Sequence, residues 1–259
     1  MTDDADPVAL LPTVANLARA AGIVVFGYYR GGFRVRRKAD TSPVTEADEA
    51  AEGLILAGLA ELTPGLPAIS EESFAHGRSP GIGKGRFWLV DPLDGTREFV
   101  NRTDEFSINI ALIENGRPVL GVIHAPMTEE TYAAAGGEAT LTARGGKPRR
   151  IGARRAPRDG IDVVESRSHG DAAATGAFLE DFVVRSRKRL GSAVKFGLLA
   201  SGLADLYPRF GPTMEWDTAA GHAILDAAGG NVRSTGGMEL AYGKPGFANP
   251  DFIARGLPA

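Results

Sequence analysis

The chain has 259 residues and a mass of 27.2 kDa, enough for one large domain or two closely packed halves. A net charge of −3 and a pI of about 5.9 provide no basic field to attract nucleic acid or an anionic membrane. The absence of cysteine excludes disulfides, thiolate metal sites and a cysteine nucleophile. The acidic start MTDDADP and the lack of a long uninterrupted apolar run predict a soluble cytoplasmic protein without stable membrane insertion.

The first part of the chain alternates helical and extended patterns. Apolar residues at helical spacing predict a helix over 7–30, ended by Gly31 and Gly32, and a short strand follows at 33–38. Thr45-x-x-Asp48 resembles a capping pattern and predicts a second helix over roughly 46–61. Extended segments are then expected at 67–70, 86–91, 106–113, 118–124 and 131–135, with the turn ENGR joining the third and fourth into a hairpin.

A stretch rich in Arg, Gly and Pro, residues 144–160, marks the expected boundary and predicts a solvated connecting loop. It would separate an N-terminal α+β half, 1–143, from a C-terminal α/β half, 161–259. The second half alternates again and predicts a layered arrangement of sheets and helices. Its expected strands lie at 161–166, 186–189, 203–207 and 231–234, and its helices at 171–183, 194–202 and 216–228.

Carboxylates occur at four places where solvation is not the obvious reason for them. They are Asp48, Glu71 beside Glu72, the pair Asp91 and Asp94, and Asp217. Helix-terminal acids would explain Asp48 and Asp217, a surface turn would explain Glu71, and an ordinary Asp-Gly turn would explain Asp94. Asp91 resists such an explanation because it closes the apolar run FWLV, and an unpaired buried carboxylate costs several kcal/mol unless a cation neutralises it.

The stretch LVDPLDGT offers the oxygen ligands that Mg²⁺ prefers. The bend at Pro92 lets Asp91 and Asp94 converge, and the Leu93 carbonyl can point into the same space. Gly95 lets backbone N–H groups approach an anion, and Thr96 supplies a hydroxyl. These groups suit metal-assisted phosphate-ester hydrolysis, in which two metal ions hold the attacking and leaving oxygens and one lowers the pKa of a water nucleophile.

Three segments in this order, SEES, WLVDPLDGT and EWDTAAGHAIL, resemble the lithium-sensitive, Mg²⁺-dependent phosphomonoesterases of the inositol monophosphatase superfamily. The resemblance covers essentially the whole chain and is strongest to the bacterial CysQ-type 3′(2′),5′-bisphosphate nucleotidases. RKADTSPVTEAD and YPRFGPTMEWDTAAG carry this finer similarity. The resemblance implies an αβαβα sandwich of the inositol monophosphatase and fructose-1,6-bisphosphatase type, with the site between its halves.

The resemblance also implies a role for each acid. Glu71, Asp91 and the Leu93 carbonyl would hold one Mg²⁺, and Asp91, Asp94 and Asp217 a second. Thr96 and Asp48 would position and polarise the attacking water, around a third, weakly held Mg²⁺ if one binds. Gly95 and Thr96 would cradle the scissile phosphate through their backbone N–H groups. Catalytic roles therefore fall on Asp48, Glu71 and Thr96, and Li⁺ is expected to inhibit.

On the substrate side, the resemblance points to Lys195 near the nucleotide, with a solvated helix lysine as the alternative. Lys38 could approach the scissile phosphate and Arg97 could touch the substrate; a surface position is the alternative for Lys38. Many relatives carry a hydroxyl, a thiol and a carboxylate where this chain has Ala193, Gly197 and Ser201. The metal-binding acids are kept, so these departures bear on adenosine recognition and not on catalysis.

The predicted function is Mg²⁺-dependent hydrolysis of the 3′-phosphate of 3′-phosphoadenosine 5′-phosphate to AMP and phosphate. The alternative keeps the metal chemistry and changes the substrate to inositol phosphate or a sugar (bis)phosphate. A catalytically silent binder is disfavoured because neither an acid nor Thr96 is lost. The expected partner is a small phosphate ester and not nucleic acid, and the expected assembly is a monomer or homodimer.

Overall fold

The computed structural model describes residues 5–37, 43–82 and 85–257. A seven-stranded sheet forms its centre, in the order β3-β4-β5-β6-β7-β8-β9. β3 runs parallel to β4, and each later pair is antiparallel. The strands are β3 (Ala68–Ser70), β4 (Arg86–Asp94), β5 (Ser107–Glu114), β6 (Arg117–Ala125), β7 (Glu130–Ala135), β8 (Glu138–Ala143) and β9 (Arg149–Arg150).

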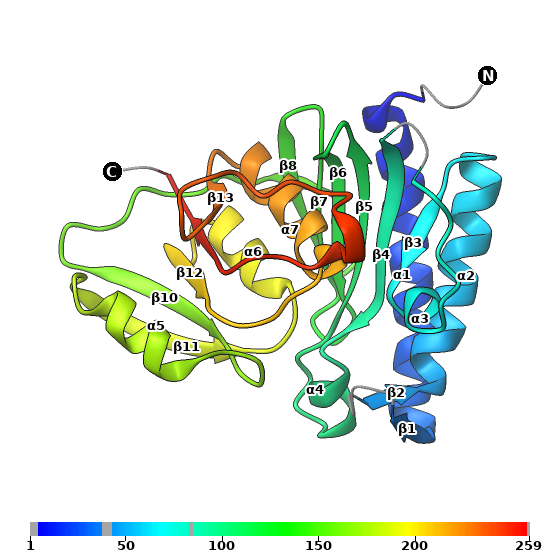
Figure 1. Ribbon diagram of the computed structural model, residues 1–259, viewed down its shortest axis with the longest axis horizontal. Coiled ribbons are helices and arrows are strands. Elements are labelled where there is room, and N and C mark those ends of the chain that lie inside the picture. Colours follow the sequence, from blue (N-terminus) through cyan, green and yellow to red (C-terminus); the bar gives the residue numbers. More distant parts are fainter. Residues whose placement is uncertain (1–4, 38–42, 83–84, 258–259) are drawn as a thin grey trace.

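Two long helices, α1 (Pro7–Gly31) and α2 (Glu46–Leu62), cover one face of this sheet (Figure 1). Their apolar residues form one core with side chains of β4, β5 and β6. Thr45 and Asp48 make the predicted capping box at the start of α2. By length and composition α1 could cross a membrane, but it packs here as a core helix with eight buried residues. A two-stranded ribbon, β1 (Val35–Arg37) and β2 (Pro43–Thr45), links the two helices.

A second, five-stranded sheet has the order β11-β10-β12-β14-β13. Its strands are β10 (Ile161–Ser166), β11 (Val184–Leu190), β12 (Leu206–Arg209), β13 (Asn231–Ser234) and β14 (Phe252–Arg255). Helices α6 (Val194–Ala200) and α7 (Glu215–Ala227) lie between the two sheets, and α5 (Ala172–Leu179) covers the outer face of the second (Figure 1). The layers are therefore α, β, α, β, α, as the resemblance implied.

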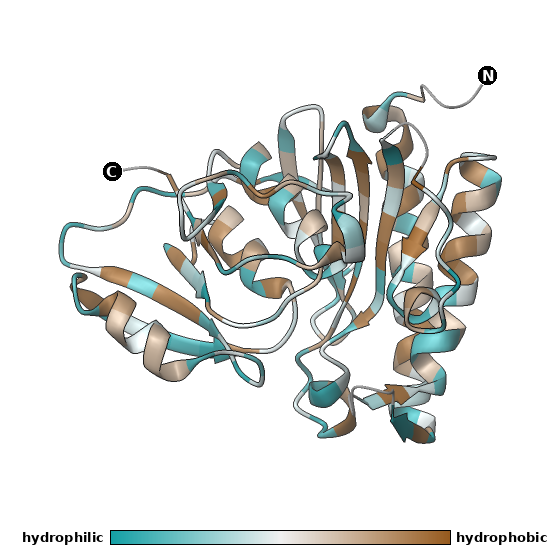
Figure 2. Cartoon of the chain, in the orientation of Figure 1, coloured by the Kyte–Doolittle hydropathy of each residue, from teal (hydrophilic) through white to brown (hydrophobic). Residues whose placement is uncertain are grey.

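Hydropathy explains the layering. Brown, apolar residues follow the central strands and the helices that face them, while teal residues lie on outward surfaces (Figure 2). The largest core joins the seven-stranded sheet to α6, α7 and the second sheet, through side chains such as Tyr132, Phe196, Trp216 and Phe252. Burial on both faces accounts for the continuous apolar runs of β4 and β5, which lack the alternation of a half-exposed strand.

Several elements differ from the sequence prediction. Short helices α3 (Glu71–Ala75) and α4 (Thr96–Val100), the 3-10 turn Pro245–Phe247, and strands β2, β8, β9 and β14 were not predicted. The segment 144–160 is not wholly a solvated loop, because β9 extends the first sheet and Ile151 and Ala153 are buried. The division into two halves at this segment stays a prediction.

Candidate active site

A cavity of about 360 Å³ gathers residues from both sheets and from α6 and α7. It brings together nearly all the residues proposed from sequence, although they lie far apart along the chain. Those that line it are Glu71, Asp91, Leu93, Asp94, Gly95, Thr96, Arg97, Lys195 and Asp217. Lys38 lies outside the described residues, so its predicted approach to the phosphate stays a prediction.

The end of β4 delivers the two central acids to this cavity. Asp91 pairs with Asn109 and Asp94 with Ser107, and the register shifts between them at a bulge, so the two acids are not spaced as in a regular strand. The Asp91 carboxylate is buried and accepts a hydrogen bond of 3.1 Å from the Leu93 N–H. Gly95 ends the strand at φ +89°, and a Cβ there would lie 2.8 Å from the Glu105 carbonyl, so glycine is required at this turn.

Asp48 reaches the cavity through Thr96. One of its carboxylate oxygens accepts hydrogen bonds from the N–H and hydroxyl of Thr45, at 2.8 and 2.6 Å. Its other oxygen lies 3.2 Å from the Thr96 hydroxyl, which is also 3.1 Å from the Leu93 carbonyl. The capping role and the functional role of Asp48 are thus compatible, because each uses a different oxygen.

Asp217 approaches from the first turn of α7, where its carboxylate accepts a hydrogen bond of 2.8 Å from the Met214 N–H. Burial, with the negative charges of Asp94 and Glu71, raises the pKa of Asp217 well above its usual value. Burial also raises the pKa of Asp94, although Lys195 and hydrogen bonds from Asn109 and Ala193 oppose the rise. The acids therefore repel one another in a poorly solvated space, which is where a cation is stabilised most.

The donors around this cavity fit Mg²⁺ in kind, being carboxylates, a backbone carbonyl and a hydroxyl. They do not yet form a closed cage: within the described ranges, no group of three or more acidic or histidine side chains is arranged to hold a metal ion. Asp94 and Asp217 instead accept hydrogen bonds from backbone amides. Which of these residues ligate a metal stays a prediction.

Lys195 is buried and not a solvated helix lysine, so that alternative is wrong. Its ammonium donates to the carbonyls of Leu190 and Ser192 and lies 5.1 Å from the ring centre of Tyr207. Burial lowers the pKa of Lys195 to about 8, although the charge of Asp94 opposes this. Among the described residues the ammonium donates two hydrogen bonds, which leaves its third N–H for a ligand in the cavity.

Arg209, the last residue of β12, was missed by the sequence reasoning. Its side chain is 5% exposed and lines the cavity, and one nitrogen donates to the Pro212 carbonyl at 2.8 Å. Its Nε and other terminal nitrogen have no hydrogen-bond partner among the described residues. The available signal was an arginine inside the apolar segment LADLYPRF, because a buried guanidinium needs an anionic or polar partner.

The three departures from the usual pattern occupy different surroundings. Ala193 lines the cavity and donates its N–H to Asp94. Gly197 faces the Tyr132 ring. A Cβ added to Gly197 would lie 2.8 Å from three atoms of that ring. Neither Gly197 nor Ser201 is among the residues that line the cavity. Only Ala193 can therefore alter what the cavity recognises directly, and Gly197 serves the packing of α6 on β7.

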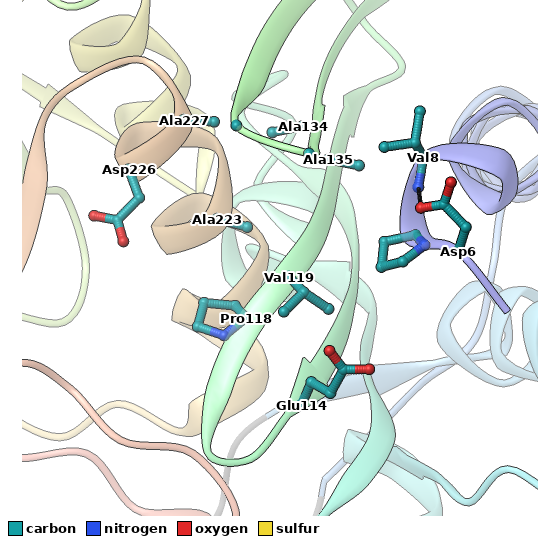
Figure 3. A pocket seen from close by; sticks show the side chains of 13 residues that line it. Asp6, Val8, Glu114, Pro118, Val119, Ala134, Ala135, Ala223, Asp226 and Ala227 are labelled. Atoms are coloured by element: carbon teal, nitrogen blue, oxygen red, sulfur yellow. Dashed lines mark hydrogen bonds between the residues drawn. The ribbon is translucent and has the colours of Figure 1, made fainter. Parts of the chain in front are cut away.

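A second cavity, of about 420 Å³, lies beside the start of α1 and between β6, β7 and α7 (Figure 3). Its floor is formed by small apolar side chains such as Ala134, Ala135 and Ala223, and its acids are Asp6, Glu114 and Asp226. No lysine or arginine is found among the described residues that line it. This cavity does not suit an anionic substrate.

Comparison with known proteins identifies the family of this chain. Residues 7–255 match the model of the inositol monophosphatase family. The chain is 45% identical over 247 residues to the 3′(2′),5′-bisphosphate nucleotidase CysQ of Escherichia coli K12, covering 94% of this chain and 98% of that protein. It is 46% identical, with the same coverage, to the CysQ protein of Salmonella typhimurium.

Solved structures show the same fold. The crystal structure of CysQ from Bacteroides thetaiotaomicron superimposes with a TM-score of 0.80 at 38% identity, covering 95% of this chain and 97% of that one. An IMPase of Thermotoga maritima gives a TM-score of 0.76 at 29% identity, with 93% and 89% covered.

Proposed function

The chain belongs to the inositol monophosphatase family, and from this premise we propose that it hydrolyses the 3′-phosphate of 3′-phosphoadenosine 5′-phosphate, giving AMP and phosphate. The observation that supports this substrate is the presence of two kinds of charge in one cavity. Glu71, Asp91, Asp94 and Asp217 line it together with the buried cations Lys195 and Arg209. A substrate with two phosphates matches such a site better than a monoester does.

Glu71, Asp91, Asp94, Asp217 and the Leu93 carbonyl would hold two Mg²⁺ ions, and a third could be held weakly near Asp48 and Thr96. Bound Mg²⁺ supplies positive charge that stabilises the phosphoryl oxygens and lowers the pKa of water. Li⁺ is expected to inhibit by occupying a carboxylate site with one charge instead of two.

The chain's own groups orient the reacting water and the phosphate. When the Thr96 hydroxyl donates a hydrogen bond to Asp48, its oxygen can accept a hydrogen bond from the attacking water and hold that water in line with the phosphorus. The N–H groups of Gly95 and Thr96 would contact the scissile phosphate. Water oxygen forms the new bond to phosphorus, and the bond from phosphorus to the 3′-oxygen breaks. Of the two protons that the water brings, one is taken up by the leaving oxygen, which becomes the ribose hydroxyl, and the other stays on the released hydrogen phosphate.

The second phosphate would bind Lys195 and Arg209. The ammonium has an unused N–H, and the guanidinium has two nitrogens without partners among the described residues. Charge-assisted hydrogen bonds to phosphate would satisfy these buried donors. Arg97 is exposed at the edge of the cavity and could contact the substrate there.

We place this reaction in the cytoplasm, in a monomer or homodimer.

A panel of phosphate esters tests the proposal. We expect kcat/KM for adenosine 3′,5′-bisphosphate to exceed that for adenosine 3′-monophosphate and inositol 1-phosphate by about tenfold or more, because these monoesters leave the buried cations without a phosphate. Fructose 1,6-bisphosphate also has two phosphates, so it tests whether the nucleotide itself is recognised. Released phosphate is measured with Mg²⁺, with EDTA, and with Li⁺ at tens of millimolar, on the order of a weak monovalent affinity. A tenfold preference for inositol 1-phosphate would overturn the substrate, and full activity in EDTA would overturn the chemistry.

The variant Asp91→Asn tests the central acid. We expect kcat to fall by about a thousandfold, because the substitution removes a charge shared by both proposed metal sites, worth several kcal/mol. Asp226→Asn is the control, since Asp226 is exposed and borders only the second cavity. Activity of Asp91→Asn equal to wild type at matched Mg²⁺ would show that Asp91 holds no essential metal.

A further inference from the structure

The loop that carries Lys195 into the cavity is held by a carboxylate outside the cavity wall. This carboxylate belongs to Glu105, in the connection between α4 and β5. Its Oε2 accepts hydrogen bonds from the Gly191 N–H and from Arg167 Nε, both at 2.7 Å. Its Oε1 accepts a bond of 2.6 Å from Arg167 Nη2, so the arginine is bound by both carboxylate oxygens.

These contacts join the first sheet to the end of β11. Arg167 Nη2 also donates to the Arg189 carbonyl at 2.9 Å, and the Arg167 N–H donates to the Leu190 carbonyl at 3.0 Å. The approach is close: a Cβ on Gly191 would lie 2.5 Å from the Glu105 carbonyl. Glu105 and Arg167 therefore determine where residues 189–191 lie relative to the first sheet.

The position of residues 189–191 in turn determines where the Lys195 ammonium lies, because the ammonium binds backbone carbonyls of this loop. Ser192 has a φ of +50°, a left-handed conformation that costs a non-glycine residue on the order of 1 kcal/mol unless its surroundings hold it. In this conformation its carbonyl, together with that of Leu190, accepts hydrogen bonds from the Lys195 ammonium. The residue before it is held by Glu105, and the residue after it donates its N–H to Asp94.

We propose that Glu105 is a positioning residue for Lys195, and that through Gly191 and Arg167 it sets the ammonium for the second phosphate of the substrate. The inference rests on the proposed function, because it concerns the phosphate that is not hydrolysed. Glu105 is not among the residues that line the cavity, so it would act on the substrate only through the residues that it holds, Gly191 and Arg167. Partial burial acts to raise the pKa of Glu105, but Arg167 and the Gly191 N–H outweigh it and lower this pKa, so the group stays ionised.

The experiment compares two substrates, adenosine 3′,5′-bisphosphate and adenosine 3′-monophosphate, in wild type and in Glu105→Gln. We expect the variant to raise KM for the bisphosphate by about tenfold, the worth of one charge-assisted hydrogen bond, with kcat nearly unchanged. The constants for the monophosphate should move by less than about twofold, since that substrate makes no use of the second subsite. Arg167→Gln, which removes the other half of the contact, should behave in the same way.

A double-mutant cycle distinguishes positioning from a general loss of structure. Lys195→Ala alone should lower the bisphosphate preference, and adding Glu105→Gln to it should change that preference no further, because the two residues act through one ammonium. Additive effects would overturn the inference. Glu239→Gln is the matched control, since Glu239 pairs with Arg117 at an exposed site away from the cavity and should leave both substrates unaffected.

The outcomes separate this inference from the proposed function. A wild type without preference for the bisphosphate overturns the proposed function, and the role of Glu105 falls with it. A wild type that prefers the bisphosphate while Glu105→Gln and Arg167→Gln keep the full preference overturns the positioning role alone. Circular dichroism and melting curves establish that each variant is folded, and if Glu105→Gln is not, Arg167→Gln carries the test.

Discussion

Single residues in this protein combine structural and chemical roles. Asp48 caps α2 with one carboxylate oxygen and contacts Thr96 with the other. Lys195, expected near the nucleotide with a solvated helix lysine as the alternative, is almost fully buried between two carbonyls and the ring of Tyr207. A buried ammonium with a lowered pKa is poised to change charge near physiological pH. The charge of Lys195, and with it the binding of a phosphate, should therefore depend on pH.

The affinity for the second phosphate should depend on the protonation of Lys195. Its pKa is lowered to about 8, so raising the pH from 7 through 8 to above 9 removes the positive charge. We expect KM for adenosine 3′,5′-bisphosphate to rise over this range, by about tenfold, while KM for adenosine 3′-monophosphate stays level. Initial rates across this pH range measure both.

Lys195→Arg is the control for this prediction, because arginine stays charged throughout the range. The variant should lose the pH dependence of KM even if its affinity is lower. The same rise of KM in wild type and in Lys195→Arg would assign the titration to another group.

Whole elements show which sequence patterns are reliable. The periodic helices α1 and α2 and the hairpin β5–β6 were predicted nearly to the residue, because their burial pattern repeats along the chain. Helices α3 and α4 have five residues each, too few for a periodic signal, and they follow strands where the chain must turn at the cavity. β9 has only two residues and pairs with the preceding strand β8, so it gives no periodic signal of its own. β14 is a strand because it pairs with β12 and β13, which lie earlier in the chain.

The absence of a side chain at Gly197 lets α6 lie close against β7. We expect Gly197→Ala to lower the free energy of unfolding by about 1–3 kcal/mol, because its Cβ would meet the buried Tyr132 ring. Gly176→Ala in α5 is the control: nothing lies within 4 Å of a Cβ there, so it should be stabilising by up to about 1 kcal/mol. Urea unfolding compares the two, and equal effects would show that Gly197 is not required by the contact.

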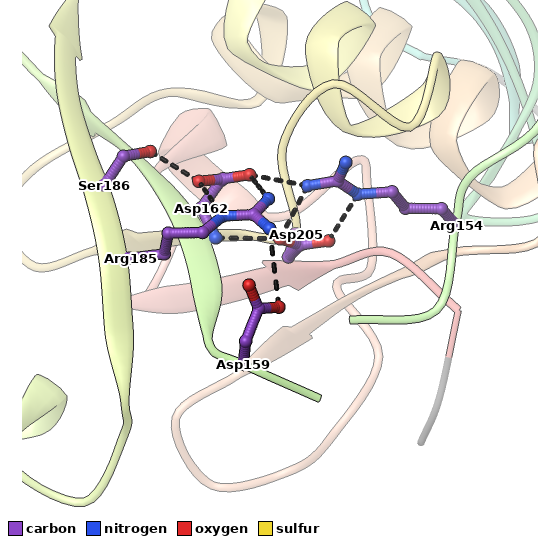
Figure 4. A network of polar contacts seen from close by, with 6 residues as sticks. All are labelled: Arg154, Asp159, Asp162, Arg185, Ser186 and Asp205. Atoms are coloured by element: carbon purple, nitrogen blue, oxygen red, sulfur yellow. Dashed lines mark hydrogen bonds and ion pairs between the residues drawn. The ribbon is translucent and has the colours of Figure 1, made fainter. Parts of the chain in front are cut away.

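At the scale of the whole molecule, a charged network fastens the segment 144–160 to the second sheet (Figure 4). Asp205 accepts hydrogen bonds from Arg154 Nε and Nη2, at 2.9 and 3.0 Å, and from the Asp162 N–H at 2.7 Å. Asp162 in turn binds Arg154, Arg185 and Ser186. Hydrogen bonds from Arg185 and Ser186 are the largest causes that lower the pKa of Asp162.

Asp205→Asn should lower the free energy of unfolding by about 2 kcal/mol, because Arg154 and the Asp162 N–H would lose a carboxylate whose side chain is only 3% exposed. Asp159→Asn is the matched control in the same network. Its side chain is 72% exposed and meets Arg185 at 3.5 Å, so it should change stability by less than about 0.5 kcal/mol. Chemical denaturation measures both, and similar losses would contradict the assignment of the network's strength to Asp205.

The sequence by itself determined the layered fold, the main helices and strands, and the set of acids that share one cavity. The helices and strands follow from local periodicity, and the layered arrangement follows from their alternation. The αβαβα order of the layers and the grouping of Glu71, Asp91, Asp94 and Asp217 at one site follow from the resemblance of SEES, WLVDPLDGT and EWDTAAGHAIL to the inositol monophosphatase family. Only the tertiary structure decided that Arg209 lies buried with two nitrogens that find no partner in the described part of the chain, that Gly197 faces a ring and not the substrate cavity, and that Glu105 holds the loop of Lys195. Each of these depends on two segments far apart in the chain meeting side by side, and the spacing of residues along one segment carries no record of what will pack against it.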